Sequence, residues 1–234
     1  MIEYPRTPAG TQPGYFSEAY RSTHRRAPRQ PLVCLPHTLS ELTGPVYGHN
    51  PIGETDNDLT QHFAAPPLGE RIVVAGRIVD EDGRGVPHAL VEIWQANAAG
   101  RYRHSGDDHP APLDLNFLGA GRALTDAEGN YRFVTIKPGA YPWRNHYNAW
   151  RPAHIHFSLF GSALVSRLVT QMYFPQDPLI PLDPILNSIP DRGARERLVS
   201  AFDLSLTEPE WALGYRFDIV LRGRRATPFE EAVR

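Results

Sequence analysis

The chain has 234 residues, and 41% of them are hydrophobic, which is enough for one large domain with a substantial core. A formal net charge of −2, and no apolar run long enough to cross a bilayer, argue against nucleic acid or a membrane as a partner. The single cysteine, Cys34, excludes an intramolecular disulfide and a thiolate metal cluster. The polar N-terminus has no signal-peptide core, so we expect a cytoplasmic protein.

The first 69 residues are rich in proline and show no sustained hydrophobic periodicity. Such a segment cannot form a core by itself, yet it carries several tyrosines and phenylalanines whose exposure to water would be unfavourable. We therefore predict that residues 1–69 form an ordered arm that packs on a partner chain; a disordered tail is the alternative. A short helix is predicted to begin at Thr38 or Ser40.

Residues 70–234 contain short segments of strand periodicity separated by turn signals. The predicted strands are residues 71–79, 89–95, 131–133, 154–160, 164–174 and 215–221. One helix is predicted within residues 191–202, where apolar side chains recur at helical spacing after Pro190 as an early-turn proline. The fold class is therefore all-β: a β-sandwich of mainly antiparallel strands, with long loops, one or two short helices and an irregular N-terminal arm.

The strand at 154–160 carries the clearest chemical signal. Because side chains alternate along a strand, His154 and His156 point the same way and Ile155 points the opposite way. Two imidazoles on one face can share a single metal ion. The alternative is a pair of ordinary histidines on a half-buried strand.

Two long loops, 97–122 and 137–152, hold side chains that could complete the metal site. Aspartates would give a 2-His-1-carboxylate ferrous site or a hydrolytic zinc site. These aspartates are Asp107, Asp108 and Asp114. Tyr102 and Tyr141 are the other candidates, and a phenol binds well only as phenolate, which requires a strong Lewis acid such as Fe(III). Spacing alone does not decide between aspartate and tyrosine, and each tyrosine could also be a packed aromatic.

Taken together, several segments resemble the β chains of the protocatechuate 3,4-dioxygenases, which belong to the intradiol ring-cleavage dioxygenase family. These segments are residues 91–97, 100–104, 135–139, 141–145 and 150–157, with further likeness at 171, 177–180 and 215–219. The resemblance covers nearly the whole chain. It implies a β-sandwich, at 70–234, that cleaves 3,4-dihydroxybenzoate with O2 to 3-carboxy-cis,cis-muconate in the β-ketoadipate pathway of aromatic degradation.

The resemblance also implies a site. One non-haem Fe(III) per chain would be held by Tyr102, Tyr141, His154 and His156, with a solvent hydroxide as the fifth ligand. Catalytic roles would fall to Tyr141, Arg151, Gln171 and Trp143. The substrate would be bound by Tyr20, Arg26, Trp143 and Ile185. Tyr141 would leave the iron and take a substrate proton, and Arg151 could stabilise negative charge on the substrate.

The implied partner is a homologous α chain in a hetero-oligomer, with the pocket between the two chains. Catechol and hydroxyquinol 1,2-dioxygenases use the same set of two tyrosines and a His-x-His pair and are the enzymatic alternative. They carry a long helical N-terminal dimerisation segment, which the proline-rich arm of this chain does not resemble. A zinc hydrolase and a transthyretin-like sandwich that only binds ligands are the alternatives from other classes.

Overall fold

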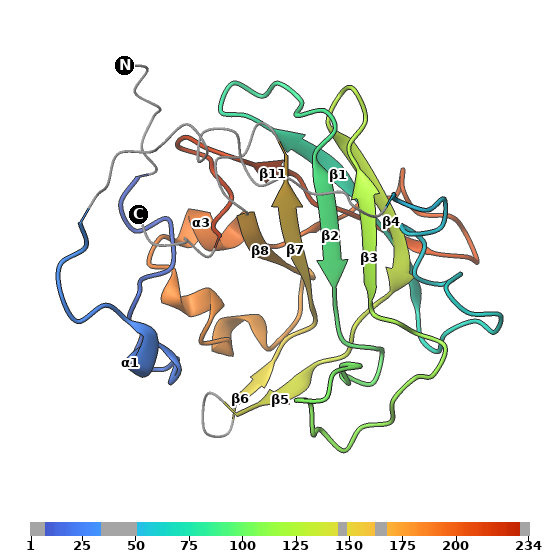
Figure 1. The fold of residues 1–234 in the computed structure, drawn as a ribbon, viewed down its shortest axis with the longest axis horizontal. Helices are drawn as coiled ribbons and strands as arrows, with labels where there is room; N and C mark the ends of the chain where they lie inside the picture. The colour runs from blue at the N-terminus through green and yellow to red at the C-terminus, as the bar shows by residue number, and fades with distance from the viewer. Residues whose placement is uncertain (1–7, 34–50, 145–148, 162–167, 230–234) are drawn as a thin grey trace.

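The computed structural model describes residues 8–33, 51–144, 149–161 and 168–229. Two β-sheets pack face to face, and a two-stranded ribbon extends beyond one end of them (Figure 1). The first sheet contains β1 (Arg71–Val79), β4 (Asn130–Ile136), β9 (Ala201–Phe202), β10 (Leu213–Arg216) and β11 (Ile219–Val220). The second contains β2 (Leu90–Trp94), β3 (Ala120–Leu124), β7 (His154–Phe160) and β8 (Leu168–Tyr173). The ribbon consists of β5 (Tyr141–Trp143) and β6 (Ala149–Arg151).

The second sheet is wholly antiparallel, and the first is mixed. The second sheet has the order β3-β2-β7-β8 with every neighbour antiparallel. In the first sheet β1 pairs antiparallel with β4, and in parallel with β10 and then β11 along its length. Short helical turns connect these strands: α1 (Thr23–Arg26), η1 (Ile180–Leu182), η2 (Leu186–Ser188) and α3 (Arg192–Glu196). The predicted all-β sandwich with short helices is confirmed.

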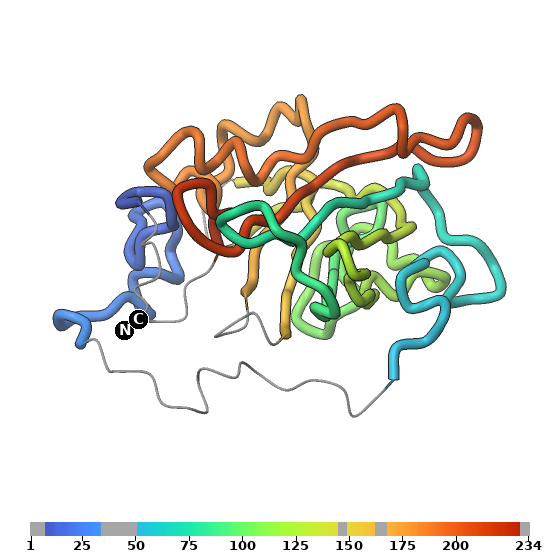
Figure 2. Tube along the Cα trace, turned by 90° about the horizontal axis from the view of Figure 1, so that it is seen from above, coloured from blue at the N-terminus to red at the C-terminus, as the bar shows by residue number. Residues whose placement is uncertain are grey.

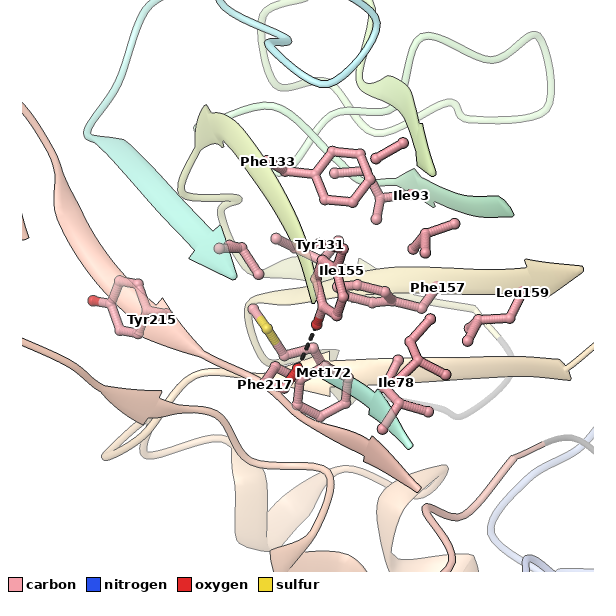
Figure 3. Packing of buried hydrophobic residues seen from close by; sticks show 14 of the residues in the cluster. Ile78, Ile93, Tyr131, Phe133, Ile155, Phe157, Leu159, Met172, Tyr215 and Phe217 are labelled. Carbon is pink, nitrogen blue, oxygen red and sulfur yellow. Dashed lines mark hydrogen bonds between the residues drawn. The ribbon is translucent and has the colours of Figure 1, made fainter. Parts of the chain in front are cut away.

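The core lies between the two sheets (Figure 3). Ile72 from β1 and Phe157 from β7 are 0% exposed, and burial of each such side chain contributes roughly 1.5–3 kcal/mol. The buried hydroxyl of Tyr131 donates a hydrogen bond to the carbonyl of Phe217, so this phenol does not lose its hydrogen bonding in the core. Since the apolar residues of β7 face this core, the alternate residues of β7 face away from it.

The strand predicted at 215–221 is interrupted. β10 ends at Arg216 and β11 begins at Ile219, because the carboxylate of Asp218 accepts the backbone N–H of Arg77 at 2.8 Å, where a continuous ladder would offer a carbonyl. The predicted alternation nevertheless holds, since the side chains that were expected to face inward are buried. These are Tyr215, Phe217, Ile219 and Leu221.

The helix predicted within 191–202 is shorter than expected. α3 ends at Glu196, and Asp191 is its N-cap, so Pro190 precedes the helix instead of occupying its first turn. The residues that follow form backbone hydrogen bonds with Tyr173 at the end of β8. Tertiary pairing therefore ends a helix that side-chain spacing alone would have continued.

The two described parts of the N-terminal arm lie at opposite ends of the molecule (Figure 2). In the second part, 51–69, Leu59 is fully buried in the core, and its N–H donates to the carbonyl of Val134 at 2.8 Å. In the first part, 8–33, Phe16 is 60% exposed and Val33 is 77% exposed. The role of the arm toward another chain stays a prediction at this point.

The predicted helix start at Thr38 or Ser40 and the cysteine at 34 lie outside the described residues. Within the described part of the chain, no helix has the length and apolarity needed to span a membrane. The expected cytoplasmic location stays a prediction.

Candidate metal centre

β7 places His154 and His156 side by side on its outward face, with ring centroids 4.9 Å apart. The Nδ1 atom of His154 lies 2.7 Å from the carbonyl oxygen of Pro152. Because a carbonyl can only accept a hydrogen bond, Nδ1 carries the hydrogen and Nε2 presents a lone pair to the site. This is the tautomer that a metal-binding histidine uses.

The ring of His156 stacks on Trp94, its neighbour across the β2–β7 pair, with centroids 4.7 Å apart and planes 4° apart. Burial, followed by the positive charge of Arg151, lowers the pKa of His156 to about 3. The same causes lower the pKa of His154 well below its ordinary value. Both imidazoles are therefore neutral, as metal coordination requires.

Tyr102 and Tyr141 reach the histidines from different parts of the chain. Their rings meet edge to face with centroids 5.4 Å apart. The hydroxyl of Tyr141 lies 3.3 Å from Nε2 of His154, and the ring of Tyr102 lies 6.4 Å from that of His156. The structure thus brings together all four side chains of the predicted ligand set.

The hydroxyl of Tyr102 is buried and has no hydrogen-bond partner among the residues that the structure describes. Burial, followed by the neighbouring Tyr141, raises the pKa of Tyr102 well above its ordinary value. A buried hydroxyl without a partner is unfavourable, and a ligated metal ion would satisfy this oxygen. The unpartnered phenol and the two neutral imidazoles therefore fit a metal ion.

Arg151, from β6, closes one side of the centre and is 2% exposed. Its Nε and Nη2 atoms donate to the carboxylate of Asp183 at 3.2 and 2.8 Å, and Nη2 also donates to Gln171 at 2.7 Å. Its Nη1 atom lies 3.1 Å from Nε2 of His154. The structure therefore places Arg151 and Gln171 beside the histidine pair.

Two family models match the chain: "Dioxygenase" over residues 42–223 and "Protocatechuate 3,4-dioxygenase beta subunit N terminal" over residues 4–38. The chain is also 60% identical to the protocatechuate 3,4-dioxygenase beta chain of Burkholderia cepacia, over 94% of both chains. The chain belongs to the protocatechuate 3,4-dioxygenase β-chain family. The resemblance inferred from its motifs is confirmed.

Other relatives of this β-chain family are more distant. The protocatechuate 3,4-dioxygenase alpha chain of Pseudomonas putida is 30% identical over 85% of this chain and 98% of its own length. The solved 3-chlorocatechol 1,2-dioxygenase of Rhodococcus opacus 1CP has the same fold, with a TM-score of 0.56 and 23% identity over 76% of this chain and 70% of its own. Intradiol dioxygenases are an iron-dependent family. Membership in it excludes the transthyretin-like alternative.

The aspartates considered as alternative ligands are held elsewhere. Asp107 accepts the backbone N–H of Tyr102 at 2.7 Å, and Asp108 pairs with Arg144 at 2.6 Å. Asp114 accepts two backbone N–H groups. Within the described residues, no group of three or more His, Cys, Asp or Glu side chains could hold a metal. The zinc-hydrolase alternative therefore has no carboxylate ligand among the described residues.

The predicted pocket residues from the arm are connected to Arg151 through Trp143. The guanidinium of Arg26 lies 4.6 Å over the ring of Tyr20, and Tyr20 meets Trp143 edge-on with centroids 4.9 Å apart. Trp143 in turn lies 5.8 Å beneath the guanidinium of Arg151. These contacts connect residues far apart in sequence: Arg26 contacts Tyr20, Tyr20 contacts Trp143, and Trp143 contacts Arg151.

Ile185, the remaining predicted pocket residue, lines a small apolar cavity together with Gln171 and Tyr173. Sequence reasoning did not single out Trp94, Asp183 or Tyr173 as site residues. Trp94 was visible only as a strand residue, because the register that sets it against His156 is a tertiary property. The sequence did contain one signal for Asp183: it is the only charged residue among the apolar and proline-bearing residues 178–186, which could have indicated a buried aspartate.

Two glycines allow the tyrosine-bearing loops to touch. Gly100 has φ +78°, and a Cβ there would lie 2.1 Å from the carbonyl oxygen of Ala140. A Cβ on Gly139 would lie 2.4 Å from the carbonyl oxygen of Ala98. The carbonyl of Asn97 accepts the N–H groups of Gly100 and Gly139 at 3.0 and 2.9 Å. Close backbone approach therefore sets the distance between the two tyrosines.

We expect Gly100→Ala to lower metal retention as well as thermal stability. The added methyl group must displace the loop of Tyr141, besides the backbone strain of about 1–3 kcal/mol that a positive φ imposes. Gly83→Ala is the matched control, because Gly83 has φ +82° and no atom of the described residues would lie within 4 Å of the added methyl group. Both variants should unfold at lower temperature, but only Gly100→Ala should lose metal in elemental analysis. Equal metal content in the two variants would contradict the role of this contact.

Proposed function

We propose that this chain is the catalytic β chain of an intradiol dioxygenase that cleaves protocatechuate (3,4-dihydroxybenzoate) with O2 to 3-carboxy-cis,cis-muconate, in the β-ketoadipate pathway of aromatic degradation. The observation that carries the proposal is the convergence of two tyrosines and two neutral histidines in a chain of this family. The 60% identity to a named protocatechuate 3,4-dioxygenase beta chain supports this substrate over catechol and hydroxyquinol.

In this proposal one non-haem Fe(III) per chain is held by Tyr102, Tyr141, His154 and His156, with a solvent hydroxide as the fifth ligand. Two phenolates and one hydroxide balance the charge of the ferric ion, and the imidazoles add donors without adding charge. When bound, the ion would supply the Lewis acidity that lets a catechol lose both hydroxyl protons, and the resulting dianion is electron-rich enough to react with O2. The hard phenolate donors favour a trivalent ion over zinc.

The surrounding side chains have separate tasks in the proposed reaction. Tyr141 is at the centre and belongs to a short ribbon, so as a phenolate it can move and accept a proton from a substrate hydroxyl. The guanidinium of Arg151 stabilises negative charge that develops on the substrate. Gln171 and Trp143 each contact Arg151, and in this proposal they orient the aromatic ring of the substrate. Tyr20, Arg26 and Ile185 complete the substrate pocket.

We expect Tyr141→Phe to keep the metal but to lower kcat/KM for protocatechuate by about 10²–10⁴-fold, the usual contribution of a positioned acid or base. One phenolate contribution to the visible charge-transfer band should also disappear. Tyr15→Phe, at an arm position that is 38% exposed, is the control and should change neither property. A substrate complex in which Tyr141 still coordinates the metal would contradict its role as the departing ligand.

We also propose that residues 1–69 pack on a homologous α chain, leaving 70–234 as the catalytic sandwich. The separate α chain of Pseudomonas putida, 30% identical to this chain, supports a hetero-oligomer of two related subunits. The exposed Phe16 and Val33 in the arm offer apolar surface to such a partner. Because Tyr20 of the same arm contacts Trp143, the interface would lie at the mouth of the pocket.

The proposed function is tested with the iron-loaded complex and three substrates. We expect equimolar consumption of O2 and protocatechuate, formation of 3-carboxy-cis,cis-muconate, and a visible band from tyrosinate bound to Fe(III). Catechol and hydroxyquinol should give much lower kcat/KM. Efficient turnover of catechol without turnover of protocatechuate would favour the 1,2-dioxygenase alternative. A colourless zinc protein would exclude both.

A further inference from the structure

Asp183 is a fully buried carboxylate beside the candidate metal centre, with 0% exposure. Its Oδ2 atom accepts hydrogen bonds from Nη2 of Arg151 and from the hydroxyl of Tyr173, both at 2.8 Å. Its Oδ1 atom accepts from Nε of Arg151 at 3.2 Å. A buried ion pair is weak evidence for a gain in stability, because desolvation opposes the attraction of the charges. Stability alone therefore does not account for this buried carboxylate.

The hydrogen-bond donors of Arg151 show what the aspartate does. A guanidinium has five N–H donors in a rigid planar fork. The Nε donor goes to Asp183, and Nη2 is surrounded by acceptors on Asp183, Gln171 and Tyr173. The remaining nitrogen, Nη1, lies 3.1 Å from Nε2 of His154. Because the fork is planar, fixing Nε and Nη2 also fixes the direction of Nη1.

We propose that Asp183 is a positioning residue that fixes the guanidinium of Arg151 so that Nη1 faces the metal centre and the bound substrate. Tyr173 supports it, since its hydroxyl donates to Asp183 and accepts from Arg151. The catalytic part of this inference rests on the function proposed above. The geometric part, the orientation of Arg151, does not.

The local chain explains why the carboxylate can hold this position. Asp183 directly follows η1, and its N–H donates to the carbonyl of Ile180 at 3.3 Å. Its backbone carbonyl accepts from the side chain of Asn187 at 2.9 Å. The segment that carries Ile185 is therefore tied through Asp183 to Arg151 on β6. A change at Asp183 should reach the centre through Arg151.

The test compares variants of the iron-loaded complex. Asp183→Asn keeps the shape of the side chain but removes its charge, and Arg151→Gln removes the group through which Asp183 acts. A displacement of a catalytic group by about 1 Å can cost about 10²-fold, so we expect each single variant to lower kcat/KM for protocatechuate by about that factor. Metal content should stay at the wild-type level in Asp183→Asn.

The double variant decides how Asp183 acts. If its effect passes through Arg151, the double variant should be no worse than Arg151→Gln alone, within about threefold, because effects of residues in one network are not additive. The double variant also removes both buried charges, so it is expected to fold even if one single variant does not. Tyr173→Phe, which keeps the ion pair, should give a smaller loss of activity than Asp183→Asn.

Asp203→Asn is the matched control, because Asp203 pairs with Arg216 at 2.7 Å near the edge of the first sheet. It should lower thermal stability at most slightly and leave kcat/KM unchanged. In a crystal structure of Asp183→Asn, the guanidinium of Arg151 should have rotated from its wild-type position. Multiplicative losses in the double variant, or an unmoved guanidinium with wild-type kcat/KM, would overturn the proposal. If the wild-type complex does not turn over protocatechuate, the proposed function fails, while the position of the guanidinium still decides the geometric inference.

Discussion

Replacing His154 with alanine should abolish iron retention. Its Nε2 atom lies 3.3 Å from the hydroxyl of Tyr141 and 3.1 Å from Nη1 of Arg151, so it is central to the cluster. Loss of an outer hydrogen-bond partner of a metal ligand typically weakens metal binding by about 10–100-fold, and loss of the ligand itself should exceed that. Elemental analysis and the visible charge-transfer band of the purified complex measure the result.

The control for this experiment is His104→Ala, which removes an exposed imidazole from the loop that carries Tyr102. It should leave the iron content and colour unchanged. Stoichiometric iron and unchanged colour in the His154 variant would refute the assignment of His154 as a ligand. A thermal scan of both variants without iron separates loss of the ligand from loss of the fold.

The strands that position the histidines could be predicted from the sequence. Residues 71–79 and 154–160 match β1 and β7 at both ends, because alternating or β-branched apolar residues fix the period and the faces. The break before β11 could not be predicted, since it depends on the side chain of Asp218 reaching a backbone amide of β1. Similarly, α3 ends where the chain pairs with β8, a contact absent from local propensity.

The candidate site, like the fold, could be predicted from the sequence only in part. The outward pair His154 and His156 follows from strand geometry alone, whereas the choice between tyrosine and aspartate depended on the family resemblance. In the structure that choice has a physical basis: Asp107 accepts hydrogen bonds from backbone amides, while the buried Tyr102 hydroxyl has no partner within the described part of the chain. Asp183 could not be predicted as a site residue, because its contacts with Arg151 on β6 and Tyr173 on β8 are tertiary and leave no pattern in the sequence.

We expect the chain expressed alone to be poorly soluble or inactive, and co-expression with a homologous α chain to restore colour and turnover. The described arm exposes Phe16 by 60% and Val33 by 77%, and such apolar surface favours a partner chain over water. The same arm holds Tyr20 against Trp143, so without the partner the pocket mouth would lose its support. Size-exclusion chromatography with light scattering, together with O2 uptake, measures both effects.

A pair of matched variants locates the interface. Phe16→Glu places a charge on the arm, and Leu204→Glu places the same charge at a position that is 78% exposed and lies beyond β9. Only the arm variant should weaken the complex with α, and so lower its yield and specific activity. Burial of one phenylalanine is worth about 1.5–3 kcal/mol, which corresponds to a loss of affinity of about 10- to 150-fold. If the isolated wild-type chain is instead monomeric, soluble and fully active on protocatechuate, the pocket is complete without a partner and the arm must serve another purpose.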